Sequence, residues 1–471
     1  MNWDDYAKWA ADIAAWGRDY HTSIRDLPVR AQTKPGDIAA QLMDSAPETG
    51  QPMQQIWDDF QNIVLPGMTH WQHPRFFAYF PANATPPSML AEQVASIMAA
   101  QCMLWQTAPA ATEMETKVLD WLRISVGLPD GFTGVIQDSA SGATLAAVLT
   151  MRERALSWSG NAAGLSGQPR LRIYCSAEVH SSIDRAVWIS GIGGDNIVRL
   201  PVTGDLRSVD TDAMRRAIQD DINAGFVPAG IIACVGGTGM GACDNIADVI
   251  KVAQEFGLYT HVDAAWAGSA MICPEYRHLW AGVEGADSIV FNPHKWMGVQ
   301  FDCSAHFLKN PADLVKTLAI QPEYLKTHGQ NGFINYSEWS VPLGRRFRAL
   351  KLWFMLRVYG MEELRNRIRN HVTWSHHLAT RLAATPDFEI VTQPILSLFT
   401  FRYAPQGADD LNTLNQRLVD AINDDGRIYI TQTLIDGAKV IRFQAGQFDC
   451  TAEDINAAYD VICDIAKDIA P

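Results

Sequence analysis

The 471-residue sequence lacks the cysteine patterns that mark metal-binding and redox-active proteins. Its eight cysteines include no C-x-x-C pair and no spacing typical of a zinc site. The amino terminus is acidic and has no apolar core of the signal-peptide type. No window approaches the roughly 18 uninterrupted apolar residues of a transmembrane helix. These absences predict a protein of the reducing cytoplasm that does not span a membrane.

Positive charge is also scarce. The chain has 38 Lys and Arg residues against 52 Asp and Glu residues, which gives a formal net charge of −14. This balance disfavours nucleic acids and anionic membranes as partners. The acidic residues are spread along the chain, as on an ordinary solvated surface. With 48% hydrophobic and 19% charged residues, the composition is that of a globular protein of about three domains.

Short β-branched runs alternate with helical stretches through the middle of the chain. The segments expected as strands are 134–136, 171–175, 196–200, 230–235, 259–263, 288–292 and 305–308. This alternation predicts an α/β fold with a mostly parallel sheet that is covered by helices on both faces. Ligands bind such sheets in the crevice at the carboxyl ends of the strands.

The amino-terminal part has a different pattern. Residues 3–24 place aromatic side chains on one helical face, and a second helix is expected over residues 53–63. Two such helices cannot form a core alone. Docking on the rest of the same chain and docking on a second copy are equally allowed.

The last hundred residues suggest a small α+β domain. Strands are expected at 396–401, 427–431 and 440–443, with helices near 411–422 and after Thr451, where a capping-box pattern begins. The predicted organisation is therefore an N-terminal helical segment (1–85), a large domain (86–362) and a C-terminal α+β domain (363–471).

The strongest chemical signal lies at the exits of two expected strands. One strand runs into Pro293-His294-Lys295, where the proline ends strand pairing. A partly desolvated lysine loses its proton readily and can attack a carbonyl group. The other strand ends in Asp263, which small residues follow. A carboxylate and a lysine at neighbouring strand ends suit pyridoxal phosphate, because one keeps the pyridine nitrogen protonated and the other carries the cofactor as an imine.

Two further motifs allow more than one interpretation. Ser139 begins a run of small and hydroxyl residues that opens a helix, which suits either an anion site or a simple N-cap. The run from Gly237 to Gly241, with Asp263 further on, is similar to a dinucleotide-binding fingerprint. It has the spacing G-x-G-x-G instead of G-x-G-x-x-G, and a nicotinamide cofactor would leave Lys295 unexplained. His70 and His73 have no third ligand at a suitable spacing, so no metal site is predicted.

Six separated motifs, in the right order, resemble the group II pyridoxal-phosphate decarboxylases, specifically the aromatic-L-amino-acid decarboxylases. The motifs are HWQHPRFFAYFPANATPPSML from His70, APAATEMETKVLDWL from Ala108, GVIQDSASGATLAA from Gly134, AEVHSSIDRA from Ala177, the run from His261 to Ser304, and VPLGRRFRALKLWF from Val341. The resemblance implies a fold-type-I enzyme with pyridoxal 5'-phosphate as its cofactor. It also implies a homodimer that converts an aromatic L-amino acid to its amine and CO₂.

The resemblance assigns roles to individual residues. It implies that Lys295 carries the cofactor, that Asp263 pairs with the pyridine nitrogen and that His180 stacks on the ring. Further contacts to the cofactor are implied for Ser139, Ala140, Ser141, Thr238, Ala265, Asn292 and His294. The wall of the substrate pocket is implied for Trp71, Tyr79, Phe80, Pro81, Gln101 and Met103, partly across the dimer interface. Gln101 and Met103 are less apolar than this wall predicts, which leaves the ring preference open.

Residues 323–339 are polar and rich in glycine, and we expect them to form a lid. By resemblance, Tyr336 of this segment protonates the substrate Cα after CO₂ leaves. Family members that release an aldehyde carry Phe there, so Tyr336 favours simple decarboxylation. The alternatives are an aromatic aldehyde synthase and a non-catalytic homologue that binds pyridoxal phosphate. The sequence does not choose among tyrosine, dopa, phenylalanine, tryptophan and 5-hydroxytryptophan.

Overall fold

The structure is a computed structural model and describes residues 1–320 and 333–469. The described residues form two compact units. The first unit contains residues 1–81, 374–391 and 400–469, and the second contains 82–373 and 392–399. The N-terminal helices thus belong with the C-terminal residues. One reason is a shared buried carboxylate in the first unit, because Arg25 and Arg75 both bind Asp454, at 2.9 and 3.0 Å.

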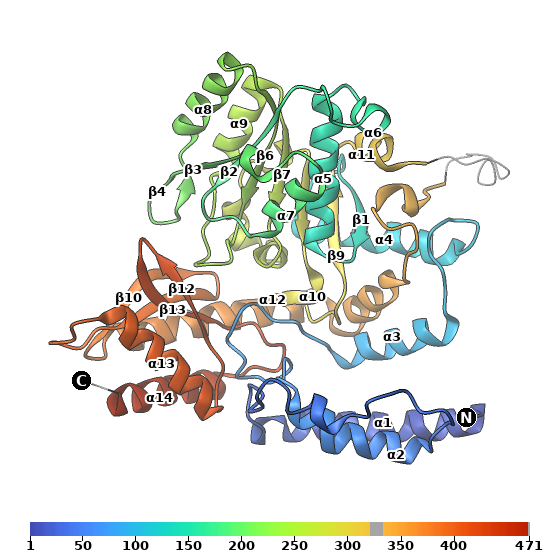
Figure 1. Cartoon of the computed structure of the whole chain (residues 1–471), viewed down its shortest axis with the longest axis vertical. Helices are drawn as coiled ribbons and strands as arrows, with labels where there is room; N and C mark the ends of the chain where they lie inside the picture. The colour runs from blue at the N-terminus through green and yellow to red at the C-terminus, as the bar shows by residue number, and fades with distance from the viewer. Residues whose placement is uncertain (321–332, 470–471) are drawn as a thin grey trace. The chain divides into compact units, whose positions relative to one another are not determined.

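The second unit is built on a seven-stranded sheet (Figure 1). The strand order is β1-β9-β8-β7-β6-β2-β3. The strands are β1 (Thr133–Gln137), β2 (Leu171–Ser176), β3 (Ile197–Leu200), β6 (Val227–Cys234), β7 (Tyr259–Asp263), β8 (Ser288–Phe291) and β9 (Ser304–Leu308). Neighbours from β3 to β8 pair in parallel, whereas β9 runs antiparallel to both β8 and β1. Every residue of β7 and β8 is buried, as is usual for parallel strands covered on both faces. The expected mostly parallel α/β fold is confirmed.

Helices surround this sheet (Figure 1). They are α3 (Pro86–Met98), α4 (Pro109–Val126), α5 (Ala140–Ala155), α6 (Gly160–Ala163), α7 (Ser182–Ile189), α8 (Thr211–Asn223), α9 (Ile246–Phe256), α10 (Pro293–Trp296) and α11 (Pro311–Leu318). Helix α5 crosses the sheet and contacts β1, β6, β7, β8 and β9. Helices α8 and α9 pack on β6 and on each other. Between them and the sheet edge, β4 (Val202–Thr203) and β5 (Ser208–Val209) form a separate hairpin.

The first unit contains a four-stranded antiparallel sheet of order β10-β11-β13-β12. Its elements are β10 (Phe388–Ile395), β11 (Leu398–Tyr403), β12 (Thr431–Ile435), β13 (Ala438–Gln444), α13 (Leu411–Asp425) and α14 (Ala452–Asp468). The last residues of β10, the first residues of β11 and the turn between them (392–399) belong to the second unit. Long helix α12 (Arg348–Ala383) begins in the second unit and ends in the first, with a break at Gly360, where φ is +69°.

Two C-terminal predictions need correction. Strand β10 was not expected, and the strand expected at 427–431 is absent from the described structure except for a bridge between Tyr429 and Phe76. Ile430 needs no strand partner, because the side chain of Asn423 bonds both its N–H and its C=O at 3.1 Å. The predicted capping box at Thr451 is confirmed at the start of α14.

The N-terminal helices dock on each other within one chain. They are α1 (Trp3–Ser23) and α2 (Met53–Asp59). Trp16 of α1 meets Trp57 edge-on, with ring centroids 5.4 Å apart, and lies 5.7 Å from Phe60. Whether this helical pair docks on the rest of the chain or on a second copy stays a prediction. Residues on the remaining surface of α1 are at most partly buried.

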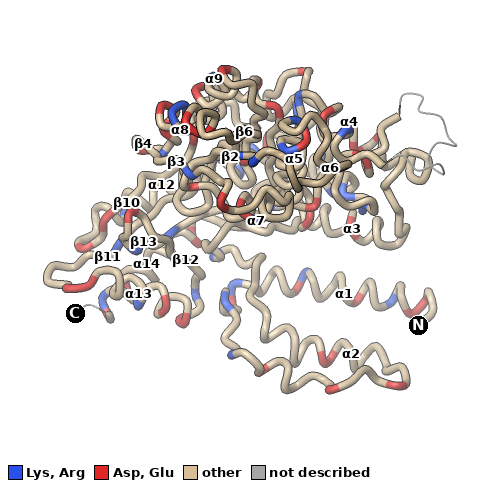
Figure 2. The backbone as a smooth tube through the Cα atoms, turned by 45° about the horizontal axis from the view of Figure 1, so that its top comes forward, with Lys and Arg blue, Asp and Glu red and all other residues tan. Residues whose placement is uncertain are grey.

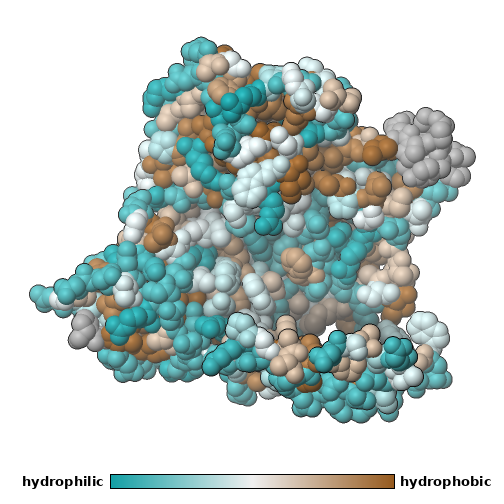
Figure 3. Space-filling view, viewed as in Figure 1, coloured by the Kyte–Doolittle hydropathy of each residue, from teal (hydrophilic) through white to brown (hydrophobic). Residues whose placement is uncertain are grey.

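In the views drawn, no charge sign is concentrated on the surface, whereas apolar side chains gather in the upper part of the face in Figure 3. Figure 2 shows acidic and basic residues interspersed along α8. The face of the β12–β13 region drawn in Figure 3 is mainly hydrophilic. Among the described helices, none is long and apolar enough to cross a membrane. All eight cysteines are free.

Candidate active site

The predicted cofactor residues of the second unit follow the carboxyl ends of its strands. Strand β7 ends at Asp263, and β8 leads through Asn292 to Lys295. These two strands are neighbours, with Asp263 paired opposite Val290. His180 follows β2, Thr238 follows β6 and Ser139 follows β1. Because these strands point in one direction, their ends share one edge of the sheet, where α/β proteins bind ligands.

The backbone of Lys295 is fixed on both sides. Asn83 donates its side-chain N–H to the Lys295 carbonyl at 2.6 Å, and the Lys295 N–H bonds Asn292 at 2.9 Å. The next residue, Trp296, stacks on Trp266 with centroids 5.0 Å apart. Its Nε1–H donates to Nδ1 of His371 at 2.9 Å. The partly exposed Lys295 side chain is therefore presented from a rigid turn.

His294, on the other side of Lys295, is buried and neutral. Its Nδ1 accepts the backbone N–H of Cys303 at 2.9 Å, and its ring meets Phe301 edge-on at 4.8 Å. Burial, followed by the charge of Lys295, lowers the pKa of His294 to about 3. Since Nδ1 is an acceptor, the ring proton resides on Nε2.

Asp263, Lys295 and His180 form one electrostatic group. The Asp263 side chain is buried, and its Oδ1 accepts the N–H of Ala265 at 3.0 Å. Desolvation lowers the pKa of His180, Asp263 raises it and Lys295 lowers it further, so the first effect prevails. Nδ1 of His180 accepts the Ser182 backbone N–H at 3.1 Å, which leaves the proton of the neutral ring on Nε2. A neutral imidazole beside a carboxylate and a lysine suits the predicted stacking role.

The start of α5 is the predicted phosphate-binding end of the site. Ser139 caps this helix by accepting the Gly142 N–H at 3.1 Å. Ala140 packs in one buried cluster with Val290 and Ala265, which ties the helix start to the ends of β8 and β7. A Cβ at Gly142 would lie 2.4 Å from Oδ1 of Asp138, so a larger residue there would displace the Asp138 side chain.

The other two residues predicted near the phosphate also lie at this edge. Ser141 is exposed in the first turn of α5, and Asn292 is buried, with its Oδ1 accepting the Ser304 hydroxyl at 2.6 Å. A helix N-terminus favours a phosphate dianion, and a buried carboxylate favours a protonated pyridine nitrogen. The residues present thus fit pyridoxal phosphate.

The glycines around Thr238 serve a tight turn. The N–H groups of Gly236 and Gly237 both donate to the Ala242 carbonyl at 2.9 Å. Gly236 has φ of +83°, and a Cβ there would lie 2.5 Å from the Ala267 side chain. The turn accounts for these glycines without a dinucleotide, and Thr238 is partly exposed within it.

The residues predicted to line the substrate pocket fall in both units, and each group is described within its own unit. In the second, Gln101 accepts the Arg345 backbone N–H at 2.7 Å, and the Met103 carbonyl accepts the Ser337 N–H at 3.0 Å. Both residues therefore hold the segment that follows residue 332. Their role toward a substrate stays a prediction.

In the first unit, Trp71 and Tyr79 stack with centroids 6.0 Å apart, and both are partly exposed. The Arg442 guanidinium lies 5.4 Å from the ring of Phe80, which, like Pro81, is buried. The aromatic patch expected from the sequence is thus formed within the unit. Its role as a substrate wall also stays a prediction.

The two histidines that flank Trp71 have structural partners. Nδ1 of His70 lies 2.8 Å from the Tyr20 hydroxyl, and Nδ1 of His73 accepts the Arg75 N–H at 3.0 Å.

The structure does not bring Tyr336 to the strand exits. Tyr336 begins the short helix η10 (Tyr336–Trp339), is 1% exposed and packs in an apolar cluster with Val135, Leu308 and Leu314. Its hydroxyl lies 2.9 Å from Oγ1 of Thr116. Burial raises the pKa of this phenol. The expected proton donor is thus part of the core in this structure, and the rest of the expected lid, residues 323–332, lies outside the described residues.

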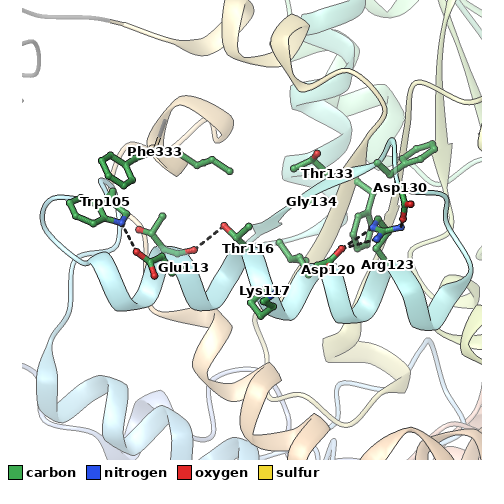
Figure 4. A pocket seen from close by; sticks show the side chains of 15 residues that line it. Trp105, Glu113, Thr116, Lys117, Asp120, Arg123, Asp130, Thr133, Gly134 and Phe333 are labelled. Carbon is green, nitrogen blue, oxygen red and sulfur yellow. Dashed lines mark hydrogen bonds and ion pairs between the residues drawn. The ribbon is translucent and has the colours of Figure 1, made fainter. Parts of the chain in front are cut away.

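A surface groove of about 450 Å³ runs along α4 beside this cluster (Figure 4). Trp105 and Phe333 stack at one end, with centroids 4.1 Å apart, and Arg123 and Asp130 lie at the other. Neither Lys295 nor any other residue of the electrostatic group lines it. The groove is therefore separate from the candidate active site.

Several supporting residues escaped the sequence analysis. Asn83 and His371 hold the turn of Lys295 from distant positions in the sequence, and Cys303 binds the neighbouring His294. The resemblance assigned no role to any of the three. Trp266 could have been found from the sequence. It lies shortly after Asp263, and Trp296 lies directly after Lys295. Two aromatic residues after neighbouring strand ends are candidates for stacking.

The fold and this site define a lysine-based pyridoxal-phosphate enzyme, and comparison with known proteins identifies its family. The pyridoxal-dependent decarboxylase conserved domain matches residues 35–404. The chain belongs to this family of decarboxylases, whose cofactor is pyridoxal phosphate.

Individual relatives match over nearly the full length. The chain is 36% identical to aromatic-L-amino-acid decarboxylase of Mus musculus, with 100% of this chain and 99% of the relative covered. It is 38% identical to phenylacetaldehyde synthase of Arabidopsis thaliana, with 94% and 92% covered. The crystal structure of Catharanthus roseus tryptophan decarboxylase in complex with L-tryptophan superposes with a TM-score of 0.94 at 32% identity, with 100% and 99% covered.

Proposed function

We propose that this protein decarboxylates an aromatic L-amino acid and releases the corresponding arylalkylamine and CO₂. The observation that carries the proposal is the group of Lys295, Asp263 and His180 at adjoining strand ends, together with an anion-binding helix start. Relatives that act on aromatic amino acids, by their names, support the substrate class.

Each residue has a physical task in this proposal. When bound, pyridoxal phosphate supplies an electron sink for the pair of electrons that CO₂ leaves behind. The Lys295 amine is the nucleophile that binds the cofactor's carbonyl carbon. The Asp263 carboxylate holds a proton on the pyridine nitrogen, and the start of α5 binds the phosphate. His180 presents a neutral ring whose orientation is fixed by Ser182.

An aldehyde synthase is the second candidate, because phenylacetaldehyde synthase of Arabidopsis thaliana is as similar to this chain as the decarboxylases are. The Tyr336 hydroxyl lies 2.9 Å from Oγ1 of Thr116, and its part in favouring the decarboxylase over the synthase stays a prediction.

The test is an amine-release screen over tyrosine, dopa, phenylalanine, tryptophan and 5-hydroxytryptophan. CO₂, ammonia and peroxide are measured in the same reactions. We expect one amine per CO₂ and no peroxide for at least one substrate. Equimolar aldehyde, ammonia and peroxide would identify the synthase instead. No CO₂ from any of the five would refute the proposal.

We further propose a cytoplasmic homodimer without nucleic-acid or membrane partners. The free, mostly buried cysteines and the net charge of −14 support the location and the absence of such partners. Helix α3 exposes the apolar side chains Met89, Leu90, Val94, Ile97 and Met98, which supports a face covered by a second copy. Light scattering coupled to size-exclusion chromatography tests the dimer. A mass near 52.1 kDa, that of one chain, would refute it.

A further inference from the structure

A buried carboxylate lies at the base of the turn after β6 and has no part in the roles given above. Asp244 is 3% exposed. Its Oδ2 accepts the backbone N–H of Cys234 and its Oδ1 accepts that of Val209, both at 2.8 Å. Its own N–H donates to the Cys234 carbonyl at 2.8 Å. Asp244 therefore joins the end of β6 to β5 and closes the loop of residues 235–243.

This loop contacts Asp263 and Glu178, the latter lying two residues before His180. The N–H of Val235 donates to the Asp263 carbonyl at 2.9 Å. A Cβ on Gly237 would lie 3.1 Å from the carbonyl oxygen of Glu178, two residues before His180. The loop is internally tight, because the Gly241 N–H also bonds the Gly237 carbonyl at 2.7 Å. A shift at its base is thus transmitted to Thr238 and to the segment that carries His180.

Backbone donors, not a cation, stabilise the Asp244 charge. The ionisable groups that interact with it are the thiols of Cys175, Cys234 and Cys243 and the carboxylate of Glu178, which is itself paired with Arg207 at 2.9 Å. On α9, the nearby Asp248 pairs with Lys251 instead. Burial outweighs the two N–H bonds and raises the pKa of Asp244 from 3.8 to about 6. The carboxyl is therefore ionised at neutral pH and gains a proton in mild acid.

We propose that Asp244 is a positioning residue, whose carboxylate holds the 235–243 loop so that Thr238 and His180 face the cofactor. The inference rests on the proposed roles of those two residues. An ionised carboxylate accepts both N–H groups as charge-assisted bonds, whereas a protonated one carries an O–H donor on one oxygen, which accepts only weakly. Protonation therefore weakens the bond from the N–H of Cys234 or Val209, and the base of the loop loosens.

Protonation of Asp244 differs from acid unfolding in a measurable way. Because the pKa is raised in the folded chain, the folded state binds this proton more tightly than the unfolded state between pH 6 and 3.8. This group alone therefore adds stability as the pH falls through that window. Activity that declines near pH 6 through Asp244 would decline without a matching fall in the melting temperature.

The test compares Asp244→Asn with the control Asp212→Asn, which removes an exposed carboxylate from α8. Hydrogen exchange of the holoenzyme at pH 7.5 follows the amides of Cys234 and Val209. Visible circular dichroism reports the orientation of the bound cofactor, and kcat/KM is measured against pH. We expect Asp244→Asn to exchange about tenfold faster at one or both amides, the scale of losing one buried hydrogen-bond partner. We also expect altered cofactor dichroism, lower kcat and loss of the acid limb near pH 6, with the control like the wild type.

Unchanged exchange and dichroism in Asp244→Asn, with only a lower melting temperature, would overturn the proposal. If that variant does not fold, the wild-type holoenzyme at pH 5.5 and 7.5 decides. Faster exchange at the two amides in acid, after correction for the intrinsic rate, supports the proposal, and equal protection overturns it. The exchange readout needs no turnover, so a wild-type enzyme without decarboxylase activity would refute the proposed function and leave the loop test intact.

Discussion

The buried ion pair between Glu115 and Arg345 contacts Ile136 of β1. We predict that removing either partner lowers the free energy of unfolding strongly, and that the two losses are not additive. The Arg345 nitrogens bind the two carboxylate oxygens of Glu115 at 2.7 and 3.0 Å, and the side chains are 3% and 2% exposed. Glu115 also accepts the N–H of Ile136 at 2.9 Å, and Arg345 donates to the Ile136 carbonyl at 2.7 Å. The pair thus holds the strand that leads to Ser139.

Removing one partner leaves the other charge buried. Arg345→Met leaves the Glu115 carboxylate with the N–H of Ile136, and Glu115→Leu leaves a buried guanidinium. Each change is expected to cost roughly 3–5 kcal/mol. The double variant buries no charge and loses mainly the two bonds to Ile136, at about 1–3 kcal/mol each at most. Its cost is therefore well below the sum of the single variants, with a coupling of roughly 3 kcal/mol.

The assay is urea unfolding of the four proteins with cofactor present, followed by near-ultraviolet circular dichroism and analysed as a double-mutant cycle. The exposed pair Asp248–Lys251 is the control, and its removal should cost about 0.5 kcal/mol or less. Costs of Arg345→Met and Glu115→Leu that add within about 0.5 kcal/mol would refute the reasoning.

Three further predictions concern the site and its surroundings. Asp263→Asn should weaken cofactor binding and lower kcat by roughly 10²–10⁴, the scale of a positioned charge partner, and near-normal turnover would place that role elsewhere. Tyr336→Phe should cost about 1 kcal/mol by losing the bond to Thr116 and leave the ratio of amine to aldehyde unchanged. A rise in aldehyde for this variant would instead support Tyr336 as the proton donor. Burial lowers the pKa of His306 from 6.5 to about 3, and neither ring nitrogen has a hydrogen-bond partner. The unfolded chain therefore takes up this proton first, and the wild type loses about 1.4 kcal/mol per pH unit below 6.5 through this group. Unfolding free energies at pH 7.5, 5.5 and 4.5 should show a flatter loss in His306→Leu, and equal slopes would contradict this.

The sequence predicts the sheet and the strand exits well because their signals are local. Short runs rich in β-branched and aromatic residues, which end at Asp263 and just before Pro293, define β7 and β8 almost to the residue. The chemistry of a lysine and a carboxylate at such ends follows from the residues themselves. Helix α14 is equally predictable, because the capping box at Thr451 is a pattern of four consecutive residues.

Features that depend on distant partners were missed. Strand β10 alternates irregularly and contains Pro394, so nothing local separates it from a loop. The position of Tyr336 depends on the apolar cluster that receives its ring and on Thr116, and a motif match cannot show either.

The central claim is that Lys295 carries the cofactor. The most direct measurement is reduction of the holoenzyme with borohydride, followed by digestion and mass spectrometry of the lysine peptides. The account predicts one reduced pyridoxyl group, attached to Lys295, and none in Lys295→Ala, while the exposed control Lys309→Ala stays labelled at Lys295. Attachment to another lysine of the wild type, or a reducible link that persists in Lys295→Ala, would contradict it.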